Sequence, residues 1–233
     1  MSPGGLHAGT GPTTNASGTE RAEAPRGYGA AMTSAHRPVP ARVAAPGDVD
    51  AIVATMTTAF FHDPLWGRAF PDEQRRAVQM TALWRLYVTS ALRYPWTLVT
   101  PGAEAAAVWI PPGGTELTPE EERGFEEALV QAAGTEVARA VLTFCGQLEE
   151  AHPAEPCFYL PLLGVHDDHR GRGLGMGLLA ESLARIDALG APAYLESSNP
   201  ANDARYASAG FLPRDTVTIA TGHVVTTMWR PAR

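Results

Sequence analysis

The residues with the clearest chemical potential lie in a glycine-rich stretch from His169 to Gly177. An apolar run at 157–165 precedes it and predicts a strand, while the run at 174–189 that follows predicts a helix. A glycine loop at a helix N-terminus exposes free backbone N–H groups where the macrodipole places partial positive charge. Arg170 and Arg172 add full positive charges, so the stretch predicts a site for a phosphate-bearing ligand.

Two common phosphate-binding patterns do not fit this stretch. The dinucleotide pattern Gly-x-Gly-x-x-Gly requires a glycine at its sixth position. Counting from Gly171, that position is Met176, and counting from Gly173 it is Leu178. The P-loop pattern requires Gly-Lys-Ser/Thr, which the sequence does not contain.

A third pattern, Arg/Gln-x-x-Gly-x-Gly/Ala, is met by Arg170, Gly173 and Gly175. Downstream, the segment from Asn199 to Phe211 has the spacing Asn-x6-Tyr-x3-Gly-Phe, in which the tyrosine is Tyr206. On these two motifs the chain resembles the GNAT family of acyl-CoA N-acyltransferases. The resemblance extends over most of the chain, and its specific motifs lie between the central strand and Phe211.

The resemblance implies an α/β fold and one GNAT domain over 38–233. Its sheet is expected to be mixed and mostly antiparallel, with a splayed central strand pair, flanking helices and a helical insertion. The segment 1–37 is rich in Gly, Ala, Thr, Ser and Pro and has no hydrophobic periodicity. Such a composition predicts a disordered tail.

Hydrophobic periodicity and turn residues predict the individual elements. The central strand at 157–165 is nearly all apolar, so we expect burial of both its faces. Pro161 cannot donate to a ladder, which suits the splay that the family has beside its cofactor. Strands are predicted at 39–44, 97–100, 105–110, 157–165, 193–197, 211–220 and 223–229, and helices at 49–60, 72–92, 119–132, 136–150, 174–189 and 201–209.

The resemblance also implies acetyl-CoA as the co-substrate, without a metal. The N–H of Leu163 is expected to face the acyl carbonyl, and the backbone of Val165 to bind the pantetheine. Asn199 and Asn202 either bond the cofactor or cap the helix that follows them. The residues expected around the pyrophosphate are Arg170, Gly171, Arg172, Gly173, Leu174, Gly175 and Met176.

Acyl transfer from a thioester needs a neutral amine, N–H donors for the carbonyl oxygen and a proton for the leaving thiolate. Tyr206 falls where many family members place the general acid; otherwise it is a core tyrosine behind the cleft. Some members carry a catalytic glutamate on the central strand, but here that position is Tyr159. Glu196, on the next strand, is the best remaining carboxylate, and it is either the base or a structural residue.

Four residues are candidates for contact with the acceptor. In the family, the region around 61–66 covers the acceptor site, which points to His62, Asp63 and Trp66. His62 and Asp63 also fit a capped turn before a proline, and Trp109 fits either the core or the cleft. The helical insertion is expected to shape the acceptor pocket, with its acids on a solvated face.

Local features resemble puromycin N-acetyltransferase and its actinobacterial relatives. They are the helical insertion, the segments 152–156 and 195–198, and Asn202 four residues before Tyr206. They imply a primary amine of a small molecule as the acceptor, for example an antibiotic such as an aminonucleoside. Two alternatives stay open: acetylation of a protein N-terminus or lysine, and a non-catalytic acyl-CoA-binding module.

Composition sets the remaining expectations. The 233 residues carry a formal net charge of −7, which gives no bias toward nucleic acid or anionic membrane. Cys145 and Cys157 lack the spacing of a metal or redox site, which suits a reducing compartment. No apolar run approaches the length of a membrane span and no signal sequence stands out, so we expect a cytoplasmic protein. It is expected to be a monomer or a homodimer. The cluster from His166 to His169 lies in the turn of the phosphate site and is not expected to bind metal.

Overall fold

A computed structural model describes residues 37–233. The tail predicted at 1–37 lies outside the described residues, apart from Arg37. The domain is built on a seven-stranded sheet in the order β1-β2-β3-β4-β5-β7-β6. The strands are β1 (Arg42–Val43), β2 (Leu98–Val99), β3 (Ala105–Ile110), β4 (Phe158–Val165), β5 (Ala193–Ser197), β6 (Leu212–Thr218) and β7 (Val224–Arg230).

Within the described residues, β4 and β5 form the parallel pair of this sheet and the other neighbouring pairs are antiparallel. The mixed, mostly antiparallel sheet is therefore confirmed. The helices of the domain are α1 (Val49–Phe60), α2 (Trp66–Ala69), α3 (Glu73–Ala91), α4 (Pro119–Ala133), α5 (Thr135–Ala151), α6 (Leu174–Asp187) and α7 (Asp203–Ser208). The predicted elements are present, and the short helix α2 is an addition that the sequence did not predict.

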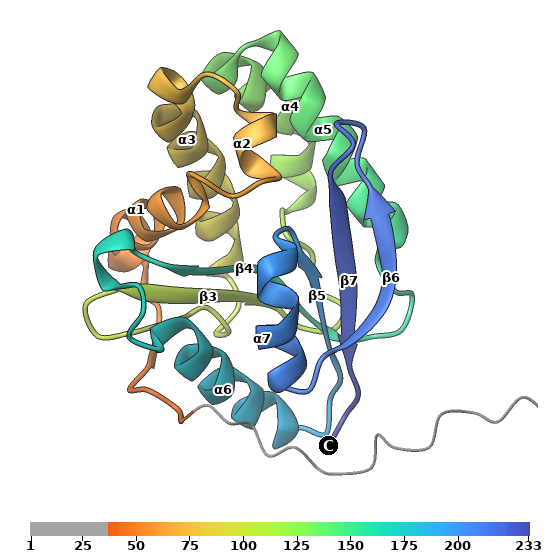
Figure 1. Cartoon of the computed structure of the whole chain (residues 1–233). Coiled ribbons are helices and arrows are strands. Elements are labelled where there is room, and N and C mark those ends of the chain that lie inside the picture. The colour runs from red at the N-terminus through yellow and green to blue at the C-terminus, as the bar shows by residue number, and fades with distance from the viewer. Residues whose placement is uncertain (1–36) are drawn as a thin grey trace, which may run out of the picture. The chain divides into compact units, whose positions relative to one another are not determined.

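Strand β3 separates two hydrophobic cores. Its alternate residues Ala106, Val108 and Ile110 pack with α1, α3, α4 and α5, while Ala105, Ala107 and Trp109 pack with α6. Figure 1 shows α1 and α3 on one side of β3 and β4, and α6 on the other. Because successive side chains of a strand point to opposite faces, a fully apolar strand can supply both cores.

The helical insertion, α4 and α5, extends the first core. Helix α4 begins with a capping box in which Thr118 Oγ1 accepts from the N–H of Glu121 and the Glu121 carboxylate accepts from the N–H of Thr118. Helix α5 reaches the β6–β7 hairpin, where the Gln147 amide donates to the carbonyl of Thr218 and accepts from the N–H of Ala220. These contacts fix α5 above the C-terminal strands (Figure 1).

Strands β4 and β5 separate after three residue pairs. The parallel register runs from Phe158↔Ala193 to Leu160↔Leu195 and ends there. Beyond it, β4 continues only against β3, and β5 continues only against β7, with Glu196 opposite Thr227. Pro161 is the first residue of β4 after the separation, so the missing N–H coincides with the splay.

The predicted burial of both β4 faces is confirmed in part. Along Phe158–Val165, buried and half-buried residues alternate. Leu162 is buried in the first core, and Phe158 and Leu160 are buried in the second. The half-buried set includes Tyr159, Pro161 and Leu163, which line a cavity.

Candidate active site

The splay opens onto a cavity of about 880 Å³. Its walls come from β4, β5, α5, α7 and the 111–117 loop, together with the aromatic residues that follow α1. Of the residues that the sequence singled out, Leu163, Glu196, Tyr206 and Trp66 line this cavity. Candidate residues from three distant parts of the chain therefore meet in one place.

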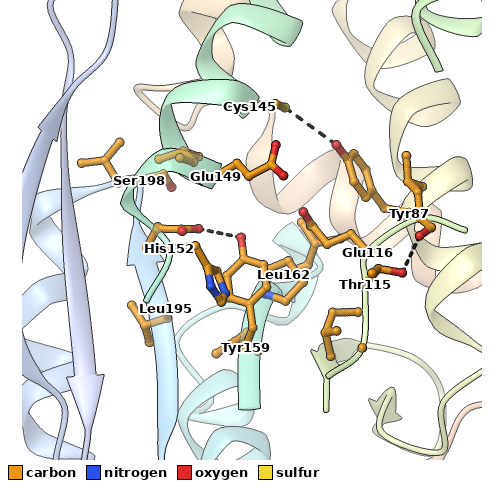
Figure 2. Close-up of a pocket in the computed structure, with 18 of the residues that line it drawn as sticks. Tyr87, Thr115, Glu116, Cys145, Glu149, His152, Tyr159, Leu162, Leu195 and Ser198 are labelled. Atoms are coloured by element: carbon orange, nitrogen blue, oxygen red, sulfur yellow. Dashed lines mark hydrogen bonds between the residues drawn. The ribbon is translucent and has the colours of Figure 1, made fainter. Parts of the chain in front are cut away.

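Glu196 is held by the residue that replaces the family's glutamate. The Tyr159 hydroxyl donates to Glu196 Oε2 at 2.6 Å (Figure 2, which labels Tyr159). Burial raises the pKa of Glu196 to about 7, although the hydrogen bond from Tyr159 acts in the opposite direction. Burial and the negative charge of Glu196 also raise the pKa of Tyr159 well above its usual value. At neutral pH the pair is thus a neutral phenol bonded to a carboxyl group poised to gain or lose a proton.

Tyr206 lies on α7, and its ring packs edge-on against Phe211 with centroids 6.3 Å apart. Burial raises the pKa of Tyr206 to about 12, and the carboxylates of Asp63 and Asp203 add to the effect. No hydrogen bond of its hydroxyl to another described residue is present. The phenol is therefore protonated at neutral pH and faces the cavity with its proton uncommitted.

The backbone of β4 turns two N–H groups toward the gap. The N–H of His166 donates to the carbonyl of Glu104 at 2.8 Å, one step beyond the pair Ala105↔Val165. Hydrogen-bonded and non-hydrogen-bonded pairs alternate along an antiparallel ladder. Val165 and Leu163 consequently fall in the non-bonded positions, so their N–H groups point away from β3, on the side that β5 leaves open.

The glycine loop adopts backbone angles that glycine favours. Gly171 has φ of 76° and Gly173 has φ of 74°, and Gly173 is the N-cap of the 14-residue helix α6. The exposed loop ends at the free N–H groups of that helix. A β-carbon at Gly175 would approach Val165 Cγ2 to 2.9 Å, so the second glycine of the motif allows α6 to start close to β4.

The two loop arginines bond within the protein. Arg170 forms an ion pair with Asp167 at 2.8 Å and donates to the carbonyl of Ala59 at 2.9 Å, which ties the loop to the end of α1. Arg172 donates to the carbonyl of Asp168 at 3.2 Å. Both guanidinium groups stay exposed, so their positive charge remains available beside the loop. Leu174 and Met176 follow on the first turn of α6, half-buried against the second core.

Asn199 caps the turn that follows it, whereas Asn202 does not use its side chain as a cap. Asn199 Oδ1 accepts from the N–H of Ala201 at 3.1 Å. Asn202 Oδ1 accepts instead from the Arg205 guanidinium at 2.7 Å. Neither side chain lines the cavity.

Asp63 joins the loop after α1 to the end of β5. Its Oδ1 accepts from the N–H groups of Leu65 and Trp66, as in the capped turn considered for this position. Its Oδ2 accepts from the Ser198 hydroxyl at 2.8 Å. Burial raises the pKa of Asp63, although the bond from Ser198 opposes this. His223 bonds the backbone carbonyl of Ser198 rather than its hydroxyl, so these three residues do not form a nucleophilic triad.

The other three candidates for contact with the acceptor lie in different parts of the structure. Trp66 lines the cavity and packs edge-on against Trp84 and Phe144, at centroid distances of 4.6 and 5.0 Å. His62 is exposed and does not line the cavity. Trp109 is fully buried in the core beside α6, on the other face of the sheet.

Sequence reasoning missed several cavity residues. Tyr87 of α3 and Cys145 of α5 meet across the cavity wall at 3.7 Å, and Glu116 and Glu149 direct carboxylates into the same space (Figure 2). Glu149 is exposed, as expected for the acids of the insertion, and it also lines the cavity. Its i, i+4 partner on α5, Cys145, also lines the cavity, which is the one sequence signal that could have placed it there.

Solved acetyltransferase structures share this fold. An acetyltransferase from Corynebacterium glutamicum described as HPA2-like and histone acetyltransferase-related is 24% identical, with 83% of this chain and 96% of that chain covered and a TM-score of 0.61. The chain has the GNAT fold. Arylalkylamine N-acetyltransferase 2 from Aedes aegypti is 15% identical, with coverage of 83% and 99% and a TM-score of 0.58. Drosophila melanogaster polyamine N-acetyltransferase, which forms N-acetylagmatine, is 17% identical, with coverage of 82% and 99% and a TM-score of 0.56.

No family model matches the chain, so the GNAT assignment describes its fold. Within residues 37–233, no group of three or more His, Cys, Asp or Glu side chains could hold a metal ion. In the same part of the chain, no helix is long and apolar enough to cross a membrane.

Proposed function

We propose that the protein is an N-acetyltransferase that moves the acetyl group of acetyl-CoA to a primary amine of a small molecule. The observation that carries the proposal is the meeting of Glu196, Tyr206 and the free N–H of Leu163 around one cavity at the splay. A proton acceptor, a proton donor and a donor to a carbonyl oxygen are the three groups that aminolysis of a thioester requires.

Glu196 is the general base of the proposed reaction. With a pKa of about 7, a substantial fraction is ionised at neutral pH and can take a proton from an alkylammonium group. The neutral amine then attacks the acetyl carbonyl. A C–N bond forms, and the C–S bond of the thioester breaks. The nitrogen loses its second proton as the amide forms, and this proton replaces the one that Tyr206 gives to the thiolate. The Tyr159 phenol keeps the Glu196 carboxylate oriented toward the cavity during this step.

Leu163 and Tyr206 would stabilise the two charges that develop. The Leu163 N–H, left unpaired by the splay, would donate to the carbonyl oxygen as it becomes negative. The Tyr206 phenol would donate its proton to the departing thiolate. With a pKa of about 12, Tyr206 is a weaker acid than an ordinary tyrosine, so the proton stays on the phenol until the thiolate forms beside it.

The glycine loop would hold the phosphates of the co-substrate. Gly171 and Gly173 have the positive φ angles of an anion-binding loop, and α6 contributes N–H groups and its dipole. Arg170 and Arg172 add exposed positive charge. Val165 follows Leu163 along β4 with its N–H on the same side, which suits a pantetheine chain that runs from the loop toward the cavity.

The shape of the acceptor cavity favours a small molecule over a peptide. The insertion α4–α5 and the 111–117 loop cover it, and α5 is fixed to the β6–β7 hairpin through Gln147. A cavity of about 880 Å³ is within the range of small-molecule sites. An extended peptide would instead need a groove open at both ends.

The proposal is tested by following thiol release from acetyl-CoA against a panel of amines, with acetyl-CoA binding measured in parallel by calorimetry. The panel comprises alkyl amines, diamines, aminonucleosides, aminoglycosides and amino acids. We expect amine-dependent release for at least one class and loss of at least about 100-fold in kcat for Glu196→Gln. Tight acetyl-CoA binding without release for any class would instead identify an acyl-CoA-binding module.

A further inference from the structure

The wall of the acceptor cavity is strongly acidic. Among the described residues that line it there are five glutamates and no arginine, and the sequence contains no lysine. His152 is the one lining residue that could carry a positive charge. The glutamates are Glu116, Glu122, Glu149, Glu155 and Glu196.

Three of these carboxylates, those of Glu116, Glu122 and Glu149, have no polar partner within the described part of the protein, and Glu122 is exposed at the surface of α4. Glu155 is paired with Arg214 at 3.3 Å, and Glu196 accepts from Tyr159. Glu116 and Glu149 form no hydrogen bond or ion pair through their side chains. Carboxylates that share a site without a compensating charge repel each other, and a bound cation would remove that cost.

Of Glu116 and Glu149, Glu116 is the more deeply placed. It lies in the loop between β3 and α4, half-buried, and points into the cavity toward Glu149 from the opposite wall (Figure 2). Burial raises the pKa of Glu116 to about 8, and the charges of Glu196 and Glu149 add to the effect. The other titratable groups that its charge reaches are Tyr87, Cys145 and Tyr159.

Glu116 and Glu196 occupy different walls. Glu196 lies at the splay on β5, whereas Glu116 lies near Tyr87 of α3 (Figure 2). Apolar side chains line the rest of the cavity, among them Trp66, Phe144 and Leu162. The cavity therefore has a carboxylate at the reacting end, a carboxylate at the far end and an apolar middle.

We propose that the acceptor carries two cationic centres joined by an apolar spacer, and that Glu116, assisted by Glu149, binds the cationic group that does not react. Resting on the proposed function, this inference names its substrate class as a diamine or an amine with a second cationic group. Glu116 is then a specificity-determining residue, since it acts on the distal charge and takes no part in the proton transfers at Glu196 and Tyr206.

The aromatic groups support the same substrate class. A cation over the face of Tyr87 or Trp66 is attracted by the ring quadrupole. The apolar spacer would contact Trp66 and Phe144, which are already held edge to face at 5.0 Å. Such walls favour an alkyl or aryl body over a heavily hydroxylated one.

The test compares linear alkyl diamines with monoamines of the same chain length, in the presence of acetyl-CoA. We expect kcat/KM to favour the diamine by at least about tenfold, equivalent to about 1.4 kcal/mol. Glu116→Gln should remove this preference through the KM of the diamine and change kcat/KM of the monoamine less than about threefold. Glu126→Gln, which removes one exposed charge from α4 away from the cavity, serves as the matched control and should keep the preference.

Calorimetry provides a readout that does not require turnover. With CoA bound, the diamine should bind more tightly than the monoamine. Because Glu116 must be ionised to bind a cation, affinity for the diamine should increase between about pH 6 and pH 8 in the native protein and not in Glu116→Gln. Glu196 is present in both proteins, and Tyr87, Cys145 and Tyr159 keep their protons over this pH range because burial raises their pKa values, so the difference between the two proteins reports Glu116.

The outcomes separate the two proposals. Transfer to monoamines or to aminonucleosides as fast as to diamines would overturn the dication inference and leave the acetyltransferase proposal intact. A diamine preference that persists in Glu116→Gln would overturn the assignment of Glu116. Absence of transfer to any amine would defeat the acetyltransferase proposal, and equal calorimetric affinity for diamine and monoamine would then defeat the inference as well.

Discussion

The Tyr159 hydroxyl donates a 2.6 Å hydrogen bond to Glu196 Oε2 across the point where β4 and β5 separate. In the register of this parallel pair, Tyr159 lies opposite Tyr194, and Glu196 follows two residues later along β5. The tyrosine that replaces a family carboxylate on one strand therefore positions the carboxylate of the next. In the proposed reaction, the base would therefore lie on β5 rather than on β4.

The pH dependence of the reaction should report on this pair. We expect kcat/KM for an amine to rise with pH through about 7, because Glu196 must be ionised to accept a proton. In Tyr159→Phe the carboxylate loses a hydrogen bond that lowers its pKa, so the acid limb should move to higher pH and the rate at pH 7 should fall. An unchanged acid limb in Tyr159→Phe would show that a group other than Glu196 titrates.

Tyr206→Phe tests the proposed acid. The phenylalanine ring would keep the contact with Phe211, so the melting temperature should change little. Loss of the hydroxyl should lower kcat by about 10²- to 10⁴-fold and leave acetyl-CoA affinity within a few fold. Steady-state kinetics with calorimetry of the same variant make the measurement. Near-normal kcat would return Tyr206 to the core tyrosine that the sequence also allowed.

A matched pair of substitutions tests the phosphate loop. Gly173 has φ of 74°, so any side chain there adds backbone strain, and Asn and Asp tolerate that region comparably. Gly173→Asp adds a negative charge beside the expected pyrophosphate, whereas Gly173→Asn adds the same bulk without it. We expect acetyl-CoA affinity to fall at least about tenfold further for Asp than for Asn, about 1.4 kcal/mol. Equal affinities in two folded variants would place the phosphates elsewhere.

The acidic cavity should also affect stability. The folded-state pKa of Glu116 is about 8, above its usual value of 4.5, so the folded protein binds this proton more tightly than the unfolded chain. The free energy of unfolding should consequently fall as pH rises from about 5 to about 8. Thermal melts should show a smaller decrease in Tm over that range for Glu116→Gln than for the native protein or for Glu126→Gln. An equal decrease in Tm in all three proteins would mean that ionisation of Glu116 does not destabilise the folded protein.

The sequence predicted the features that depend on local patterns. The glycine-rich stretch predicted a loop before a helix, and the structure has that loop, with positive φ at Gly171 and Gly173. The change from period-2 to period-3.6 hydrophobicity located the strands and most helices to within a few residues. The splay was implied by the family resemblance, and Pro161 suited it because a proline lacks the N–H donor.

The features that were missed depend on tertiary packing. Glu116 lies in an irregular loop, and its direction is set by how α4 and α5 pack over β4 and β5. Tyr159 and Glu196 were each noticed in the sequence, but their contact spans 37 positions and requires the parallel register. Trp109 was undecided between core and cleft because a fully apolar strand does not reveal which of its faces lies over the cavity.

The central claim is tested most directly by a single-turnover experiment. Protein saturated with acetyl-CoA is mixed with an excess of an alkyl diamine, and CoA thiol and acetylated amine are quantified by mass spectrometry over time. The account predicts equal amounts of the two products, formed at a rate that falls by at least about 100-fold in Glu196→Gln. Thiol release without acetylated amine, or an unchanged rate in Glu196→Gln, would contradict it.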